Sequence, residues 1–503
     1  MRFVCVLSVL TVLAMMGCDQ QSKYDVIVLQ SKVKQLESQL ATLEDEVGSA
    51  RDRVALQKNV NRLQEQLIEL QRALEEVKSN PQILKVDSRP PVEPVVEEPV
   101  RQGPTPEQIA AAIVSFENAG AKVDKDEEGN VVAVRASEFP VEQVVMEQLT
   151  NFEKIKQVSV SGPWVTQEMF EIFGQLPSLE RLDAGVTIAD GKALGNLVSL
   201  PRLKYLQLFR TDVDDEAMQV LAKMPALEQL RCGQTRIGDE GLQHLAKLKT
   251  LRAIDLSDCN RVTVAGVASL SALPKLKFLK VWGPSIQDDA MGFVAGMKAL
   301  EVLGLNDTAV TDAGFAKLAE LENLKEVHLV RTRIGDATLA VLGRMPKIQT
   351  LRLRDTQISD AGLRDLAGLE DLKKLDLSEN SSPGISDVGL KSIAKMDGLQ
   401  ELNLWTTAVT DEGVKELVNL PKLTWLNLDK TQITDATPET LSGMGQLAWL
   451  HLGSNKLTDE SIGPLLKLAQ LKYLNISYTG ISQDGFFQLD DELAERGGVV
   501  VPP

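Results

Sequence analysis

The chain has 503 residues, and its 71 acidic and 54 basic side chains give a formal net charge of −17. That balance argues against a nucleic-acid partner, because contact with phosphates requires a basic surface. Aromatic residues make up 4% of the chain and hydrophobic residues 43%, so aliphatic side chains must supply most of the core. The four cysteines, Cys5, Cys18, Cys232 and Cys259, do not indicate a disulfide framework.

The N-terminus predicts export and anchoring. A single arginine precedes an apolar stretch from Phe3 to Met16 that is too short to span a bilayer, which predicts a signal peptide over 1–17. Gly17-Cys18 resembles a bacterial lipobox, although Met15 stands where leucine is usual. The resemblance implies a lipid on Cys18, a lipidated N-terminus over 18–23, and a place on a membrane of the bacterial cell envelope, facing the periplasm or the exterior. Ordinary signal cleavage and a retained short anchor are the alternatives.

Residues 24–78 predict a coiled coil. Apolar residues alternate at spacings of three and four from Val26 to Val54, and the pattern resumes one residue out of phase from Val60 to Val77. Valine at several first core positions with leucine at the second favours two parallel strands, so a homodimer is expected. The alternative is an amphipathic helix that folds back on its own chain.

Residues 79–106 contain seven prolines and several acidic residues, which predicts an extended linker. Over 107–151 the sequence predicts a helix capped by Thr105 and then a hairpin. Because the open end of a repeat array needs a cap, this segment is expected to be the N-terminal cap of a solenoid.

Fourteen copies of the pattern L-x-x-L-x-L-x-x-T-x-[IV]-[TS]-D-x-G-L-x-x-L follow over 152–489. They align on one anchor position in each copy, and the anchors are Val158, Leu182, Leu206, Leu230, Ile254, Leu279, Leu303, Val327, Leu351, Leu375, Leu402, Leu426, Leu450 and Leu474. The step is 24 residues, except for one step of 25 after Ile254 and one of 27 after Leu375. A fixed period of this length is typical of a solenoid.

Each copy predicts one short strand and one short helix. "LxL" alternates with period two, as in a strand with one buried face, and "GLxxLxxL" spaces apolar residues as a helix does. A Thr or Ser followed by Asp, as at Thr410-Asp411, predicts a helix cap with the carboxylate in the positive first turn. One unit cannot bury its own apolar face, so stacked units must form a continuous core.

The repeats resemble leucine-rich repeats, and with the lipobox the chain resembles a bacterial leucine-rich repeat lipoprotein. The resemblance implies an α/β horseshoe solenoid with parallel strands on its concave face and short helices on its convex face, here preceded by the coiled-coil stalk and ended by a cap or tail over 490–503. Leucine-rich repeats generally place Asn five residues after the anchor to bond backbone groups between coils. Thr usually takes that slot here, and its hydroxyl is expected to do part of the same work. The repeats also resemble those of F-box receptors, but the chain shows no F-box, so no ubiquitin role is implied.

The variable strand positions supply the candidate ligand-binding residues. Residues one before, one after, three after and four after each anchor are predicted to face the concave side. Large aromatic and basic side chains there are the types enriched at binding hot spots, and they are Trp282, Trp405, Trp425, Trp449, Tyr473, His451, His328, Arg331, Arg352 and Arg354. Trp425, Trp449 and Tyr473 share one position in successive coils, so they are predicted to stack roughly 5 Å apart. The alternative is scattered aromatics that pack on their neighbours and bind nothing.

No catalytic chemistry is indicated. The histidines His244, His328 and His451 lie in separate repeats without metal-ligand spacing, and no nucleophile or phosphate-loop motif is present. "DKDEEG" begins like a calcium loop, but Arg135 stands where a glutamate ligand is needed. We therefore expect no enzyme activity, metal or cofactor. We expect a membrane-anchored scaffold that binds a protein, or else a glycan, on its concave face. The alternative is an envelope spacer in which the stalk carries the role.

Overall fold

The computed structural model describes residues 103–136, 140–380 and 384–503. The predicted signal peptide, Cys18, the predicted coiled coil over 24–78 and the predicted linker as far as residue 102 lie outside the described residues.

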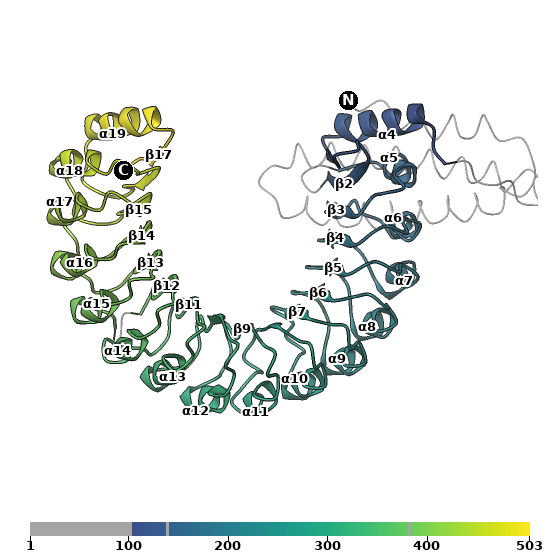
Figure 1. The fold of residues 1–503 in the computed structure, drawn as a ribbon, viewed down its shortest axis with the longest axis horizontal. Helices are drawn as coiled ribbons and strands as arrows, with labels where there is room; N and C mark the ends of the chain where they lie inside the picture. Colours follow the sequence, from purple (N-terminus) through teal and green to yellow (C-terminus); the bar gives the residue numbers. More distant parts are fainter. Residues whose placement is uncertain (1–102, 137–139, 381–383) are drawn as a thin grey trace, which may run out of the picture. The chain divides into compact units, whose positions relative to one another are not determined.

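The part of the chain from residue 103 onward is a curved solenoid built on one sheet of 17 strands. Figure 1 shows the strands along the inner side of the arc and the helices along its outer side. Neighbouring strands pair in parallel from β2 (Val131–Ala136) to β17 (Val499–Val501), while β1 (Lys122–Lys125) pairs with β2 in antiparallel fashion. The predicted leucine-rich repeat solenoid is confirmed for these residues.

The strands between these ends are β3 (Gln157–Ser161), β4 (Arg181–Gly185), β5 (Tyr205–Gln207), β6 (Gln229–Arg231), β7 (Ala253–Leu256), β8 (Phe278–Val281), β9 (Val302–Gly304), β10 (Glu326–His328), β11 (Thr350–Arg352), β12 (Lys374–Asp376), β13 (Glu401–Asn403), β14 (Trp425–Asn427), β15 (Trp449–His451) and β16 (Tyr473–Asn475).

The helices are α4 (Pro106–Asn118), α5 (Gln143–Met146), α6 (Gln167–Phe173), α7 (Gly191–Gly195), α8 (Asp215–Leu221), α9 (Asp239–Leu245), α10 (Val264–Leu270), α11 (Met291–Val294), α12 (Asp312–Phe315), α13 (Asp336–Leu342), α14 (Leu363–Leu366), α15 (Asp387–Ile393), α16 (Asp411–Leu417), α17 (Ala436–Leu441), α18 (Ile462–Leu466) and α19 (Gln483–Glu495), with short 3-10 turns η1 (Glu147–Asn151), η2 (Ala316–Leu318) and η3 (Asp459–Ser461).

Both ends of the solenoid continue the sheet. Thr105 and Gln108 form a capping box at the start of α4, as the sequence predicts, and the hairpin of β1 and β2 follows. At the other end, β17 follows the long helix α19 in the chain and pairs with β16. The boundary expected at 489/490 falls inside α19, because that helix continues past the last repeat motif.

Most strands are three residues long because the chain turns immediately after them. In all fourteen coils the residue four after the anchor has a positive φ, for example 52° at Lys430 and 54° at Arg331, and in two of them it is a glycine, Gly162 or Gly283. The residues three and four after each anchor therefore lie in a turn at the carboxyl end of the strand. This corrects the expectation that they share the strand's concave face with the residues on either side of the anchor.

Aspartates at the helix starts join ten pairs of successive coils. Asp411 Oδ1 accepts the backbone N–H of Thr434 at 2.9 Å, and its Oδ2 accepts the Thr434 hydroxyl at 2.7 Å. We call this arrangement the aspartate clasp. The same acceptance of a backbone N–H, at 2.6–2.9 Å, links Asp215 to Gly238, Asp239 to Thr263, Asp288 to Thr311, Asp312 to Gly335, Asp336 to Ser359, Asp360 to Ser386, Asp387 to Thr410, Asp411 to Thr434, Asp435 to Thr458 and Asp459 to Ser482.

The clasp refines the predicted capping role. Thr410 does cap its own helix, since its hydroxyl accepts the N–H of Glu412 at 3.2 Å. The following aspartate, however, reaches the next coil and does not serve mainly as a charge in the first turn. Val264 stands in the aspartate position of its coil, so the series of clasps is interrupted there.

The clasp also explains the glycine of the "TDxG" motif. A Cβ on Gly413 would lie 2.3 Å from Oδ1 of Asp387, the clasp aspartate of the preceding coil. Where another residue replaces this glycine opposite a clasp aspartate, it has a hydroxyl that donates to that carboxylate. Thr338 bonds Asp312 at 2.5 Å, Thr437 bonds Asp411 at 2.6 Å, and Ser461 bonds Asp435.

The threonines five residues after the anchors act within their own coils. The Thr407 hydroxyl donates to the carbonyl of Leu404 at 2.6 Å, and the others make the equivalent bond. Asn380, by contrast, bridges two coils, because its Nδ2 donates to Leu353 O at 2.8 Å and its Oδ1 accepts Thr356 N–H at 2.8 Å. A hydroxyl has one proton to donate, so threonine does not take over the bridging role that the sequence suggested.

Replacing a clasp aspartate should destabilise the solenoid. Asp411→Ala leaves the Thr434 N–H and two hydroxyls without their acceptor, and should lower the free energy of unfolding by about 1–3 kcal/mol. Asp371 is exposed and makes no hydrogen bond or ion pair in the described structure. Asp371→Ala should therefore change the free energy of unfolding by less than about 0.5 kcal/mol. Urea unfolding of both variants provides the measurement, and equal effects would contradict the clasp.

The same carboxylate predicts a pH dependence. Burial by itself raises the pKa of Asp411, but the hydrogen bonds from Thr434 and Thr437 outweigh it and hold that pKa below its ordinary value. The stabilisation is therefore present above the unfolded-state pKa of about 4 and is lost as the pH falls through the folded-state pKa. Asp411→Ala should lose this part of the acid dependence.

Two glycine substitutions should have opposite outcomes. Gly413→Ala places a methyl group against Asp387 and should cost about 1–3 kcal/mol of unfolding free energy. Gly443→Ala meets nothing within 4 Å and should be neutral or slightly stabilising. Thermal melting of the pair compares them, and a Gly413→Ala protein as stable as the wild type would show that the coils can separate without penalty.

Candidate ligand-binding site on the concave face

Three aromatic rings form a stack on the concave side of β14, β15 and β16. The parallel register pairs Trp425 with Trp449 and Trp449 with Tyr473. The two indole rings lie 4.1 Å apart at 11°, and the Trp449 and Tyr473 rings lie 4.8 Å apart at 1°. The rings are half-buried while the leucines between them are fully buried. The predicted aromatic stacking is therefore present, and we call these three residues the aromatic stack.

A row of polar side chains runs beside the aromatic stack. Asn427, His451 and Asn475 follow the anchors of the same three strands and are register partners. The His451 ring lies 5.8 Å from that of Trp449, and its Nδ1 accepts the N–H of Gly453 at 3.3 Å. Burial lowers the pKa of His451, and the nearby Asp429 offsets this in part, so the imidazole is neutral at neutral pH with Nε2 as its donor.

The asparagines of this row keep their amide donors free. Asn427 Oδ1 accepts the N–H of Asp429 at 2.9 Å, and Asn475 Oδ1 accepts that of Ser477 at 2.9 Å. Neither Nδ2 has an acceptor among the described residues. Three N–H donors therefore lie next to three aromatic rings.

Three of the predicted residues lie in turns or at the rim and are not part of the stack. Arg354 places its guanidinium 4.9 Å over the Trp405 ring and bonds Glu379 at 2.7 Å. Arg331 is exposed and makes two bonds to Asp307, at 2.5 and 2.8 Å. Because their charges are already paired, these two arginines are less available to a ligand than the sequence suggested.

Trp282 also stands apart from the stack. It lies three residues after its anchor, and its indole Nε1 is buried without a hydrogen-bond partner in the described structure. The structure thus divides the predicted site residues into four groups. These are the aromatic stack with His451, the rim residues Trp405, Arg331 and Arg354, Trp282 alone, and a pair in the middle of the sheet.

The central pair is His328 and Arg352, on the neighbouring strands β10 and β11. His328 is 5% exposed and its Nε2 has no hydrogen-bond partner, the nearest carboxylate being Glu326 at 3.8 Å. Burial is the main cause that lowers the pKa of His328 to about 4, and the positive charges of Arg352 and Lys280 contribute to the same shift. The imidazole is neutral at physiological pH.

Sequence reasoning missed several cations on this face. The Arg181 guanidinium lies 3.5 Å over the Tyr205 ring, Arg231 lies 5.8 Å from both Tyr205 and Phe278, and the Lys280 ammonium lies 5.2 Å from Phe278. These residues occupy the positions on either side of the anchors, as the aromatic stack, His451, His328 and Arg352 do. A search of those two positions for every basic residue would have found them.

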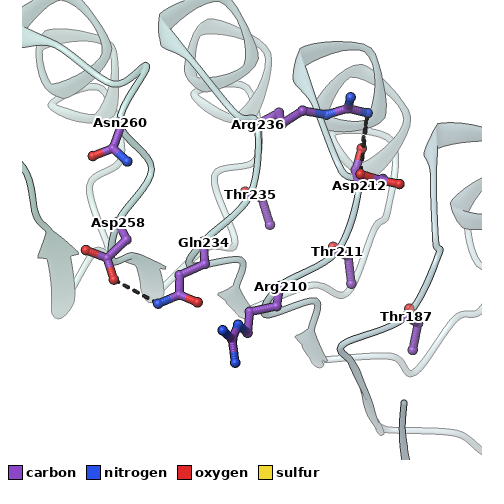
Figure 2. Close-up of a pocket in the computed structure, with 9 residues that line it drawn as sticks. All are labelled: Thr187, Arg210, Thr211, Asp212, Gln234, Thr235, Arg236, Asp258 and Asn260. Carbon is purple, nitrogen blue, oxygen red and sulfur yellow. Dashed lines mark hydrogen bonds and ion pairs between the residues drawn. The ribbon is translucent and has the colours of Figure 1, made fainter. Parts of the chain in front are cut away.

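An open pocket of about 610 Å³ lies at the rim, at the carboxyl ends of β4 to β7. Figure 2 shows its polar lining, in which Arg236 reaches Asp212 and Gln234 donates to Asp258 at 3.0 Å. The lining residues are Thr187, Arg210, Thr211, Asp212, Gln234, Thr235, Arg236, Asp258 and Asn260. Sequence reasoning did not predict this pocket, because its residues lie in the turns of four successive coils and come together only in the folded solenoid.

Residues suited to a metal do not gather in the described ranges, where no group of three or more His, Cys, Asp or Glu side chains could hold an ion. Cys232 and Cys259 are buried free thiols. The same ranges contain no helix that is long and apolar enough to cross a membrane.

A sequence profile of leucine-rich repeat regions matches residues 235–491, just over half of the chain. The chain belongs to the leucine-rich repeat family. No curated protein sequence matches it.

Several solved leucine-rich repeat structures are similar to this member of the family. An internalin from Listeria monocytogenes shares 20% identity at a TM-score of 0.46, over 73% of this chain and 94% of that one. A leucine-rich repeat protein from Leptospira interrogans shares 18% identity at 0.42, over 65% and 91%. The Arabidopsis receptor kinase HAESA, in complex with a peptide hormone and a co-receptor, shares 13% at 0.40, over 74% and 78%.

The environment of His328 predicts an unusual titration. With a folded-state pKa of about 4 and an unfolded-state pKa near 6.5, the unfolded chain binds the proton first. The protonation of His328 therefore leaves the free energy of unfolding unchanged above about pH 6.5. As the pH falls from there toward 4, it lowers that free energy by on the order of 3 kcal/mol. Imidazole NMR should show His328 neutral at pH 5, and a midpoint near 6.5 would contradict its burial.

Proposed function

We propose that the chain is a non-catalytic, membrane-anchored leucine-rich repeat protein that binds a protein ligand on its concave face. The observation that carries this proposal is the aromatic stack. The core of each coil needs the buried leucine of the strand, but it does not need large rings on either side of it. Extended concave surfaces are the binding surfaces of solenoid proteins, and Trp and Tyr are enriched at binding hot spots.

The geometry of the stack favours a protein over a glycan. A sugar ring binds against the open face of an aromatic ring. Both faces of Trp449 are covered, by Trp425 at 4.1 Å and Tyr473 at 4.8 Å, so the stack offers mainly ring edges. Ring edges suit apolar side chains, and the free donors of Asn427, His451 and Asn475 suit peptide carbonyls.

Membrane anchoring rests on the sequence of the N-terminus. Gly17-Cys18 follows the short apolar stretch, and the heptads and proline-rich segment that come next would hold the solenoid away from a bilayer as a dimeric stalk. A lipid on Cys18 would place the concave face in the periplasm or outside the cell, within reach of other envelope proteins.

Truncating the stack should abolish ligand capture. In a pull-down from envelope extract of the native host, Trp449→Ala should weaken binding of the captured partner by about 2 kcal/mol or more, which is roughly 30-fold in affinity. Tyr473→Ala should weaken it as well. The matched control is Tyr478→Ala, since Tyr478 is 84% exposed in a turn and outside the stack.

The stability of these variants must be followed in parallel, because Trp449 loses two stacked contacts worth about 0.5–1.5 kcal/mol each. Capture by a folded Trp449→Ala protein at the wild-type level would contradict the concave-face proposal. It would favour the spacer alternative, in which the stalk carries the role.

Anchoring is tested separately with Cys18→Ala expressed in the native host. The variant should move from the membrane fraction to the soluble fraction, because no lipid can be attached. If it stays in the membrane fraction as fully as the parent, lipidation of Cys18 does not hold the protein there.

A further inference from the structure

We propose that the middle of the concave face, around Lys280, His328 and Arg352, is a receptor for a short acidic segment of the protein ligand. The inference rests on the proposed function, in that the same concave face meets the ligand. It adds a second contact region away from the aromatic stack and gives the charge of the ligand there.

The residues that form this region lie in one row across four strands. Lys280 on β8 pairs with Gly304 on β9, Gly304 pairs with His328 on β10, and His328 pairs with Arg352 on β11. At about 4.8 Å between neighbouring strands, the backbones of Lys280 and Arg352 lie roughly 14 Å apart along the row. We call this row the central basic row.

Gly304 makes room for the Lys280 side chain within the central basic row. A Cβ at this position would lie 2.7 Å from Cγ of Lys280, so the lysine chain lies over the glycine and leans toward His328. Any larger residue at 304 would push the lysine away. The row therefore has a long cation at each end, and the Lys280 chain covers the glycine that lies between Lys280 and His328.

Neither cation is neutralised by the protein. Among the described residues, Lys280 and Arg352 make no hydrogen bond or ion pair with a carboxylate, whereas the neighbouring Arg331 and Arg354 are each held by one. Burial lowers the pKa of Lys280; Asp255 offsets this in part, and Arg231 and Arg352 lower the pKa further. The protein thus keeps like charges near one another, and the nearby carboxylates of Asp255 and Glu326 make no direct ion pair with Lys280 in the described structure. An arriving carboxylate would supply that direct contact.

His328 adds an unsatisfied polar atom to the floor of the row. Its side chain is almost fully buried, and Nε2 has no partner in the described structure. A buried polar atom without a hydrogen bond costs stability. A ligand oxygen that displaced the flexible Lys280 chain would give Nε2–H an acceptor.

Acidic residues at both ends limit the length of the anion. Asp255 on β7 and Asp376 on β12 flank the row, each held by the backbone N–H and hydroxyl of a serine two residues on. Glu326 lies beside His328. An extended polyanion would meet these carboxylates, so the row fits one or two adjacent carboxylates of a peptide, and not a nucleic acid or a sulfated polysaccharide.

The test uses the full chain in detergent and rhodamine-labelled hexapeptides that contain either two adjacent glutamates or two glutamines. Fluorescence anisotropy at low salt should show the glutamate peptide binding about tenfold more tightly than the glutamine peptide. Arg352→Gln and Lys280→Gln should each remove most of that difference. Arg354→Gln makes the same charge change two residues from Arg352, at a paired arginine, and should weaken binding less than about twofold.

The possible outcomes separate the two proposals. Equal binding of the two peptides, or an Arg354→Gln effect as large as that of Arg352→Gln, overturns the receptor. Stronger competition by a DNA oligonucleotide than by the glutamate peptide overturns the peptide class. Trp449→Ala should leave glutamate-peptide binding unchanged. If Trp449→Ala abolishes capture of the envelope partner while Arg352→Gln leaves peptide binding intact, the concave-face function stands and the acidic segment is excluded.

Discussion

The spacing of the coils depends on one repeated interaction, a carboxylate at the start of one helix that accepts the backbone N–H at the start of the next. Threonine in the repeated turn position bonds its own coil, as Thr407 does with Leu404. On that side the coils are joined by backbone bonds, such as that from Thr406 N–H to the carbonyl of Asp429 at 3.0 Å. Asparagine links them only where Asn380 and Asn455 occur. Clasps such as Asp411 to Thr434 link the coils through side chains on the helix side, where a glycine, or a residue with a hydroxyl, accommodates the carboxylate.

Because the clasps and the buried leucines set the fold, the strand positions beside the leucines are free to vary. That freedom gives the concave face two chemically different regions. Near the C-terminal end, Trp425, Trp449 and Tyr473 stack, and the donors of Asn427 and Asn475 lie beside them. In the middle, unpaired cations surround a buried histidine. A single protein ligand with an apolar anchor and an acidic segment would satisfy both regions, and neither region carries a constellation for catalysis.

The sequence was sufficient for the solenoid and for the aromatic stack, since both follow from the 24-residue period. It was insufficient where the contact joins two coils. "TD" predicts a cap in one helix, but the Asp387 carboxylate reaches Thr410 of the next coil, and no single copy contains that information. The positive φ at Arg331 and Lys430 ends each strand earlier than alternation suggests, so residues such as Arg354 were placed on the face and lie in turns. Lys280 belongs to no motif, and its role depends on neighbours in other coils, so the sequence of its own coil does not indicate it.

Amide hydrogen exchange on the wild-type protein tests the clasp most directly. Thr434 and Thr458 are exposed residues at helix starts, where backbone N–H groups otherwise have no acceptor. Their N–H groups bond Asp411 and Asp435 at 2.9 and 2.8 Å. The account predicts that these two amides exchange as slowly as those of strand β14, because opening them requires the coils to separate. Exchange at the rate of a free surface amide would contradict it.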